Sequence, residues 1–143
     1  MKITEDRINR LNKVNELLSF IVKTDGDSRN PFFGHKEDNG QLIAGFFLFN
    51  YRNQLRYIDP YTKEPISLHP RSKQIHRKCN EGGTGQAIIK QLGRFIMFGK
   101  QGYLNDYKEV WGWEFEPTMK VRKKAKEIGF INSIDYPHKR WGD

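Results

Sequence analysis

Three closely spaced glycines in the segment GGTGQ are the residues whose types and spacing most directly suggest chemistry. Gly82 and Gly83 lack side chains, so a ligand can approach their backbone N–H groups closely. Thr84 follows as a predicted helix N-cap, and the first turn of a helix offers unpaired donors and a partial positive charge. The segment therefore predicts phosphate binding, with Gln86 adding a side-chain contact. The alternative is a tight loop that leads into an ordinary capped helix.

Neither of two common nucleotide-enzyme motifs fits this segment. A Walker A loop requires four residues between its first glycine and Gly-Lys-Ser/Thr, and this pattern is absent. A dinucleotide-binding motif requires a glycine where Ile88 stands. The single cysteine, Cys79, excludes an internal disulfide and a Cys-based zinc site, although its basic neighbours could lower its pKa. We therefore predict no catalytic residue, no metal ligand and no cofactor. A metal-free nuclease that uses His69 or His76 stays open as an alternative.

The charge of the chain is concentrated in its second half. The 143 residues carry a formal net charge of +8. Residues 1–70 hold 10 Lys and Arg against 9 Asp and Glu, whereas residues 71–143 hold 15 against 8. A one-sided positive field attracts anions and raises their encounter rate. This imbalance predicts an anionic partner, which could be a nucleotide, DNA, RNA or an acidic protein; the alternative is a basic domain without one.

Basic residues lie close to the glycines in sequence and elsewhere in the predicted fold. Arginine gives bidentate contacts to phosphate and lysine supplies a compact charge. A basic run precedes the glycines, with Arg71 and Arg77 as its arginines. Arg56 falls on a predicted strand, where an exposed position is the alternative. The remaining candidates for the same ligand are Arg29, Arg122 and Lys123.

Hydrophobic periodicity places these residues on an α+β framework. Apolar residues at helical spacing predict a helix from about Glu5 to Val22. A second helix should begin at Thr84 and stop at Gly99, and Gly93 within it predicts a close neighbour because glycine is unfavourable in a helix interior. A third helix should follow Pro117 and stop at Gly129. Predicted strands cover residues 32–35, 41–49, 54–59 and 65–69.

The fold class predicted is one α+β domain over residues 1–143, with an antiparallel β-meander packed by an N-terminal helix and two C-terminal helices. Residues 130–143 are expected to form an irregular tail. The longest apolar run, residues 43–49, is far shorter than the roughly 20 residues that cross a bilayer. The N-terminus lacks an apolar signal core. We therefore expect a soluble cytoplasmic protein that makes no membrane contact.

Several short motifs resemble a known family of small phage proteins. They are LNKVNELLSFI in the first helix, RYIDPYT at a strand and turn, GGT and LGRFIMFG in the second helix, and KEIGF at the end of the third. The chain resembles the viral anti-Thoeris sponge family in these motifs. That resemblance implies a homo-oligomer that sequesters cyclic ADP-ribose-type signals or cyclic oligonucleotides at subunit interfaces. It implies ligand roles for Gly26, Arg29, Arg56, Thr84, Gln86 and, near the third helix, Arg122 or Lys123.

These observations predict a non-enzymatic viral protein that binds a small nucleotide second messenger and suppresses host antiphage defence. Phosphate donors without an evident general base suit a protein that holds its ligand unchanged. One alternative is a DNA- or RNA-binding accessory protein of a phage that uses the same basic half of the chain. Another is an inhibitor of an acidic host protein. Salt separates the first two, because binding of a polynucleotide weakens steeply as salt rises.

Overall fold

The computed structural model describes residues 4–24, 31–69, 71–81, 83–102 and 115–131 of the chain. Helix α1 (Glu5–Thr24) confirms the first predicted helix and extends it by two residues. Thr4 caps it, since the backbone N–H of Arg7 donates to the Thr4 hydroxyl at 3.3 Å. Its predicted apolar stripe is buried, with Val14, Leu17, Leu18, Ile21 and Val22 in the core.

The strands among the described residues form two small antiparallel sheets. They are β1 (Gly34–Lys36), β2 (Leu42–Ala44), β3 (Phe46–Phe49), β4 (Leu55–Ile58) and β5 (Pro65–Ser67). Strand β1 pairs with β2, and β4 lies between β3 and β5. The single strand predicted over residues 41–49 is therefore wrong, because the chain breaks at Gly45. There the backbone N–H donates to the carbonyl of Phe33 at 2.8 Å, and the Tyr57 hydroxyl fills the space that a side chain would need.

Within the part of the chain that is described, three helices follow the strands. Helix α3 (Gly83–Phe98) and helix α5 (Phe115–Glu127) confirm the second and third predicted helices. Gly99 and Gly129 end them with φ of 70° and 88°, values that glycine adopts readily. The short helix α2 (Gln74–Lys78) was not predicted, because the basic segment that contains it shows no helical apolar period. Ile75 is its buried residue, and the helix contacts β5 and α3.

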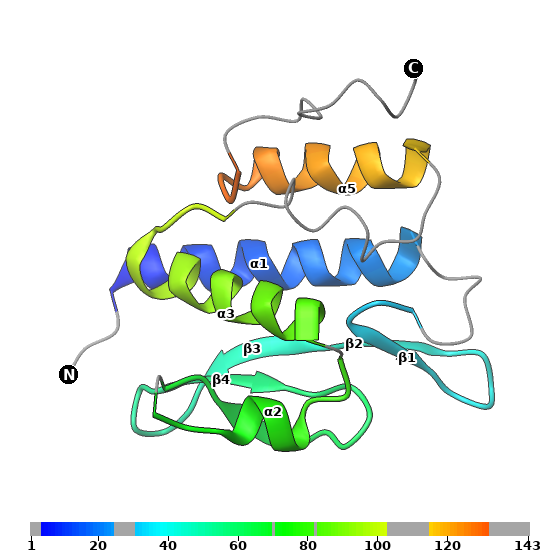
Figure 1. The fold of residues 1–143 in the computed structure, drawn as a ribbon. Coiled ribbons are helices and arrows are strands. Elements are labelled where there is room, and N and C mark those ends of the chain that lie inside the picture. Colours follow the sequence, from blue (N-terminus) through cyan, green and yellow to red (C-terminus); the bar gives the residue numbers. More distant parts are fainter. Residues whose placement is uncertain (1–3, 25–30, 70, 82, 103–114, 132–143) are drawn as a thin grey trace.

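Helix α1 lies at the centre of the molecule (Figure 1). It contacts α3, α5, β2 and β3, while α3 also contacts β4. Helix α5 lies on the far side of α1 from the strands, and α2 lies at the opposite end of the molecule, beside the three-stranded sheet. This arrangement confirms the α+β class. The helices that the structure describes include none long and apolar enough to cross a membrane.

The first residues of the predicted irregular tail belong to the core. Phe130 and Ile131 are buried, and the backbone N–H of Gly102 donates to the carbonyl of Phe130 at 2.8 Å. The ring of Phe130 packs edge-on against Phe95 of α3, with 5.6 Å between centroids. These contacts hold the end of α5 against α3. The rest of that predicted tail, residues 132–143, lies outside the described residues.

Candidate anion-binding groove

A carboxylate occupies the N-terminal end of α3, where phosphate binding was predicted. Glu81 accepts a hydrogen bond from the backbone N–H of Phe33 at 2.6 Å. Its side chain also covers Gly85, where an added Cβ would lie 2.9 Å from the Cβ of Glu81. Burial raises the pKa of Glu81, the bond from Phe33 opposes that rise, and the charge of Asp59 adds to it. A negative group at this position repels phosphate when it is ionised.

The side chain of Gln86 is engaged at both of its polar atoms. Its Nε2 donates to the carbonyl of Glu81 at 2.8 Å, and its Oε1 lies 2.9 Å from Nδ1 of His76. Because Oε1 accepts, Nδ1 of His76 must carry the proton in this pair. Gln86 thus connects α2 to the first turns of α3. Its side chain would have to give up these contacts to reach a ligand.

The segment before α3 is held by a second buried carboxylate. Asp59 is fully buried and accepts from the backbone N–H groups of Tyr61, Thr62 and Asn80 at 3.0, 3.1 and 3.0 Å. It also accepts from Nδ2 of Asn80 at 2.7 Å. Asp59 therefore connects the β4–β5 turn, through hydrogen bonds, to the segment that leads into α3. These contacts make the N-terminal end of α3 a structural junction.

The chemistry of Cys79 follows from this junction. Burial raises the pKa of the Cys79 thiol to about 11, and the charges of Asp59 and Glu81 add to the rise. The lowered pKa that its basic sequence neighbours suggested is therefore wrong, since Arg77 and Lys78 are exposed and solvent screens their charges. Burial likewise raises the pKa of Tyr57 well above its usual value. Tyr57 belongs to the core and does not form a base-stacking surface.

The other predicted ligand residues fall in several places. Arg71 and Arg77 are exposed at or before α2, and Gly83 is exposed at the start of α3. Arg122 is fully buried and Lys123 exposed on α5, across α1 from the strands, so the structure does not bring them together with the α2 region (Figure 1). Thr84 lies in the first turn of α3. The predictions for Gly26, Arg29 and Gly82 lie outside the described residues.

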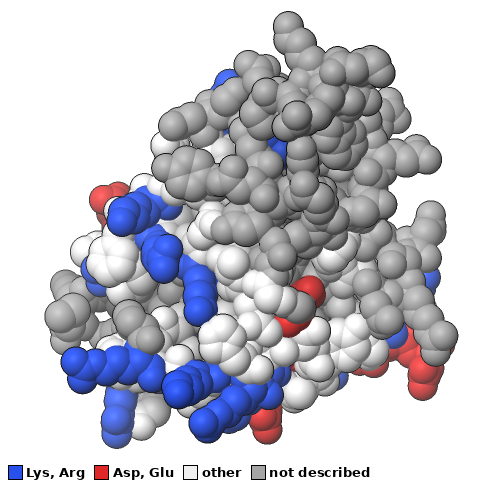
Figure 2. Space-filling model, viewed as in Figure 1, with Lys and Arg blue, Asp and Glu red and all other residues white. Residues whose placement is uncertain are grey.

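A groove with a volume of about 790 Å³ lies along the C-terminal half of α3. It contains one predicted residue, Arg56, together with Lys90, Arg94 and Lys100, which the sequence did not single out. Among the described residues that line the groove, none is an Asp or a Glu. Figure 2 shows Lys and Arg gathered over the face that α2 and α3 present. The groove is therefore a cationic site in which no lining carboxylate opposes an anion.

Two walls supply these cations. Lys90 and Arg94 are four residues apart on α3, so both face the same side of the helix. Arg56 stands on β4 opposite Ser67 of β5, and its guanidinium donates to the carbonyl of Leu55 at 3.0 Å and to Oε1 of Gln54 at 2.9 Å. These bonds hold the guanidinium against the start of β4. An anion in the groove would meet the charges of Lys90 and Arg94 along α3.

The floor of the groove is apolar because α3 packs closely on the sheet. A Cβ added to Gly93 would lie 3.0 Å from Cδ1 of Leu68 and 3.7 Å from Cδ2 of Leu55. The close neighbour predicted for Gly93 is thus confirmed. Further apolar lining comes from Ile75, Met97 and Phe98, and Phe98 remains 71% exposed. The groove offers both cations and apolar side chains.

Two arginines from α1 change the electrostatics at the C-terminal end of α3. Nε of Arg7 donates to the carbonyl of Met97 at 3.0 Å, and Nε of Arg10 donates to the carbonyl of Ile96 at 2.9 Å. The last carbonyls of a helix carry a partial negative charge. Two full positive charges more than offset it. This helix end therefore favours an anion near Arg94 and Lys100.

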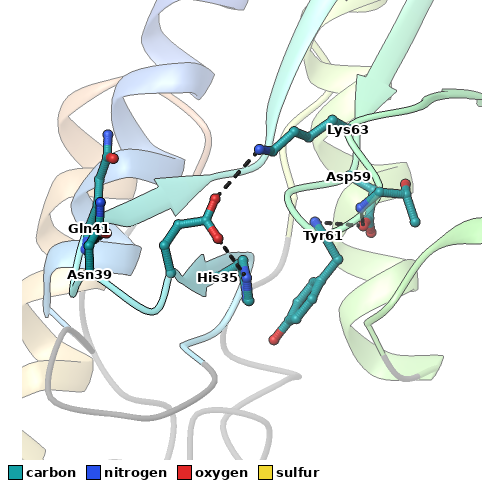
Figure 3. A network of polar contacts seen from close by, with 8 residues as sticks. His35, Asn39, Gln41, Asp59, Tyr61 and Lys63 are labelled. Carbon is teal, nitrogen blue, oxygen red and sulfur yellow. Dashed lines mark hydrogen bonds and ion pairs between the residues drawn. The ribbon is translucent and has the colours of Figure 1, made fainter.

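A separate polar cluster connects the β1–β2 hairpin to the β4–β5 turn. Glu37 lies 3.3 Å from Nε2 of His35 and accepts from Nζ of Lys63 at 3.5 Å. Figure 3 shows His35 and Lys63 on either side of one carboxylate. The His35 ring packs on Tyr61 with 4.3 Å between centroids. Nδ1 of His35 is buried and has no hydrogen-bond partner within the part of the chain that is described. A buried Nδ1 and an ion-paired Glu37 suit a connecting role.

The described residues contain no group of three or more His, Cys, Asp or Glu that could hold a metal ion.

Comparisons with known proteins place the chain among phage-related proteins. The family model described as YoqU matches residues 4–142. The SPbeta prophage-derived uncharacterized protein YoqU of Bacillus subtilis (strain 168) is 33% identical over 134 residues, which cover 94% of this chain and 91% of that protein. No solved structure matches the chain. The chain belongs to the YoqU family, which includes a prophage-derived protein.

This relationship confirms the phage connection that the sequence motifs predicted. The resemblance to the anti-Thoeris sponge family stays a prediction. The sequence did contain a signal for the groove, since Lys90 and Arg94 share a helix face with the flagged Gly93 between them. Lys100 and the facing strand positions carried no comparable local signal. Their role depends on how α3 lies across the sheet.

Proposed function

We propose that this protein binds a phosphorylated nucleotide in the groove along α3 and holds it without chemical change. The observation that carries this proposal is the lining itself, where Arg56, Lys90, Arg94 and Lys100 surround an apolar floor and no described lining residue is acidic. Arginine and lysine bind phosphate through charge-assisted hydrogen bonds. The exposed ring of Phe98 suits stacking by a base. The volume falls in the range typical of small-molecule sites.

The absence of turnover is also part of the proposal. His69 is the histidine among the described lining residues, and its Nδ1 accepts the backbone N–H of Arg71 at 3.1 Å. That bond occupies the ring nitrogen that a general base would use, and leaves Nε2 as a donor. The groove therefore supplies contacts that hold phosphate more readily than groups that cleave it. A nucleotide would leave such a site unaltered.

The resemblance to sponge proteins adds a biological role. In that role the ligand is a cyclic ADP-ribose-type or cyclic oligonucleotide signal, and binding prevents host antiphage defence from being triggered. Homo-oligomers with ligands at subunit interfaces are part of the same proposal. Membership of a family with a prophage-derived member supports a phage context.

Calorimetric titration tests the proposal. The titrants are cyclic ADP-ribose isomers, cyclic di- and trinucleotides, and adenosine mono- and diphosphate. We expect at least one of these to bind with a dissociation constant of micromolar order, and Lys90→Glu with Arg94→Glu to weaken it about 100-fold. That loss is about 2.7 kcal/mol, which two charge-assisted hydrogen bonds can account for.

The matched control is Lys126→Glu, because Lys126 is exposed on α5 across α1 from the strands. It reverses a charge without touching the groove, so binding should change by less than about threefold, as a screened distant charge allows. Two results contradict the proposal. One is that no small nucleotide binds at micromolar concentration, and the other is that the double groove variant binds as tightly as the natural chain.

A further inference from the structure

A second hollow lies beside the groove along α3. It has a volume of about 390 Å³ and is lined by Gln91, Arg94, Lys100 and Gln101. Arg94 and Lys100 line both hollows. None of the described residues around the second hollow is acidic. The two hollows are therefore neighbours with Arg94 and Lys100 between them, and we call them together the cationic track.

The spacing of charges on α3 suits a ligand with repeated anionic groups. Lys90 and Arg94 are separated by four residues of helix, which is about 6 Å along the axis at 1.5 Å per residue. Phe98 continues the same line by another four residues and is largely exposed. Lys100 then follows beyond the end of α3. The phosphates and bases of a bound chain would contact Lys90, Arg94, the ring of Phe98 and Lys100 in that order.

The far end of the track is kept cationic by the N-terminal helix. Arg7 and Arg10 of α1 cover the carbonyls of Met97 and Ile96. Without them, the carbonyl end of α3 would oppose a phosphate approaching Arg94 or Lys100. Their positions extend the favourable surface past the end of the helix. A single mononucleotide has too few phosphates to use this whole length.

We infer that the site also takes a linear single-stranded oligonucleotide, which runs from the first groove into the second hollow across Arg94 and Lys100. This inference rests on the proposed function, since it extends the same nucleotide site. Aromatic stacking on Phe98 accepts any base, and the cations contact the sugar–phosphate backbone. Stacking and backbone contacts do not depend on the identity of the base, so little sequence preference is expected from them. A cyclic dinucleotide would fill the first groove alone.

Fluorescence anisotropy with labelled thymidine oligonucleotides tests the inference on the full chain. Unlabelled thymidine monophosphate, dinucleotide, tetranucleotide, hexanucleotide and cyclic dinucleotide compete with the labelled hexamer. We expect affinity to rise about tenfold or more from the monophosphate to the hexamer, as more phosphates are neutralised. We also expect the hexamer to lose about tenfold in affinity between about 50 and 200 mM salt, and the monophosphate less than about threefold.

A substitution in the second hollow separates the track from the groove. Gln101→Glu places a negative charge next to Lys100 and removes the bond that Nε2 of Gln101 donates to the carbonyl of Gly129 at 3.3 Å. It should weaken the hexamer severalfold and the monophosphate less. Gln41→Glu is the matched control, because Gln41 is exposed on the turn between β1 and β2. Neither ligand should respond to it.

The outcomes distinguish the two proposals. If the monophosphate or cyclic dinucleotide binds as tightly as the hexamer, or Gln101→Glu leaves hexamer binding unchanged, the track is refuted while the nucleotide groove stands. If none of these ligands and none of the calorimetric titrants binds, or Lys90→Glu with Arg94→Glu changes nothing, both proposals are refuted.

Discussion

The two ends of α3 differ in a way that the helix alone would not produce. Its N-terminal end has glycines, free N–H groups and the positive end of the helix dipole, yet the carboxylate of Glu81 lies against it. Its C-terminal end has the negative end of the dipole, yet Arg7, Arg10, Arg94 and Lys100 gather there. A helix dipole is worth about half a charge at each end. Full charges brought by neighbouring elements therefore decide which end attracts an anion.

The largest expected effect concerns the N-terminal end of α3 and is the low reactivity of the Cys79 thiol. Its pKa is raised from 9.0 to about 11, so its thiolate fraction at neutral pH should be about 100-fold below that of an ordinary thiol. We expect iodoacetamide to alkylate the folded protein about 100-fold more slowly than the unfolded chain. Equal rates under both conditions would show that the N-terminal end of α3 is open to solvent.

The packing of Glu81 on the first turn of α3 gives the next effect. A methyl group at Gly85 would lie 2.9 Å from the Cβ of Glu81, so Gly85→Ala should lower the free energy of unfolding by about 1 to 3 kcal/mol. Gly83→Ala is the matched control, because nothing lies within 4 Å of a Cβ added there. Guanidinium unfolding followed by circular dichroism measures both. If Gly85→Ala does not lower the free energy of unfolding, Glu81 does not cover the start of α3.

The ionisation of Glu81 gives the smallest effect. Its pKa in the folded protein is raised, so its contribution to stability is full below the unfolded pKa and is lost as the pH rises through the folded pKa. Glu81→Gln keeps an acceptor for the Phe33 N–H and has no charge to bury. The stability of this variant relative to the natural chain should therefore increase between about pH 4 and pH 7. A difference that is constant over this range would show that the carboxylate is solvated.

Local patterns in the sequence predicted much of the fold. The apolar stripe of α1, the glycine that ends α3 and the close neighbour of Gly93 all depend on residues near one another in the chain. The break at Gly45 was missed because it depends on Tyr57, twelve residues away on a paired strand. Helix α2 was missed because contacts with β5 and α3 hold it, with little help from its own sequence.

The candidate site was harder to predict than the fold. A Gly-rich helix start is a local signal for phosphate, but the side chain that fills it, Glu81, takes its position from a bond to Phe33, 48 residues away. The groove depends on α3 lying across β4, which brings Arg56 to the same hollow as Lys90 and Arg94. No spacing within the sequence predicts that Arg56 lines the same hollow as Lys90 and Arg94. Only Arg56 was identified from both the sequence and the structure.

Nuclear magnetic resonance can compare the two ends of α3 directly. Backbone amide signals of the isotopically labelled protein would be followed as a thymidine or adenosine nucleotide is added. The proposed site predicts that the signals from Lys90 to Gln101, and that of Arg56, shift with the nucleotide, while those from Gly83 to Ala87 stay in place. Shifts confined to Gly83–Ala87, with Lys90, Arg94 and Lys100 unaffected, would contradict the groove and return the site to the glycine-rich start of the helix.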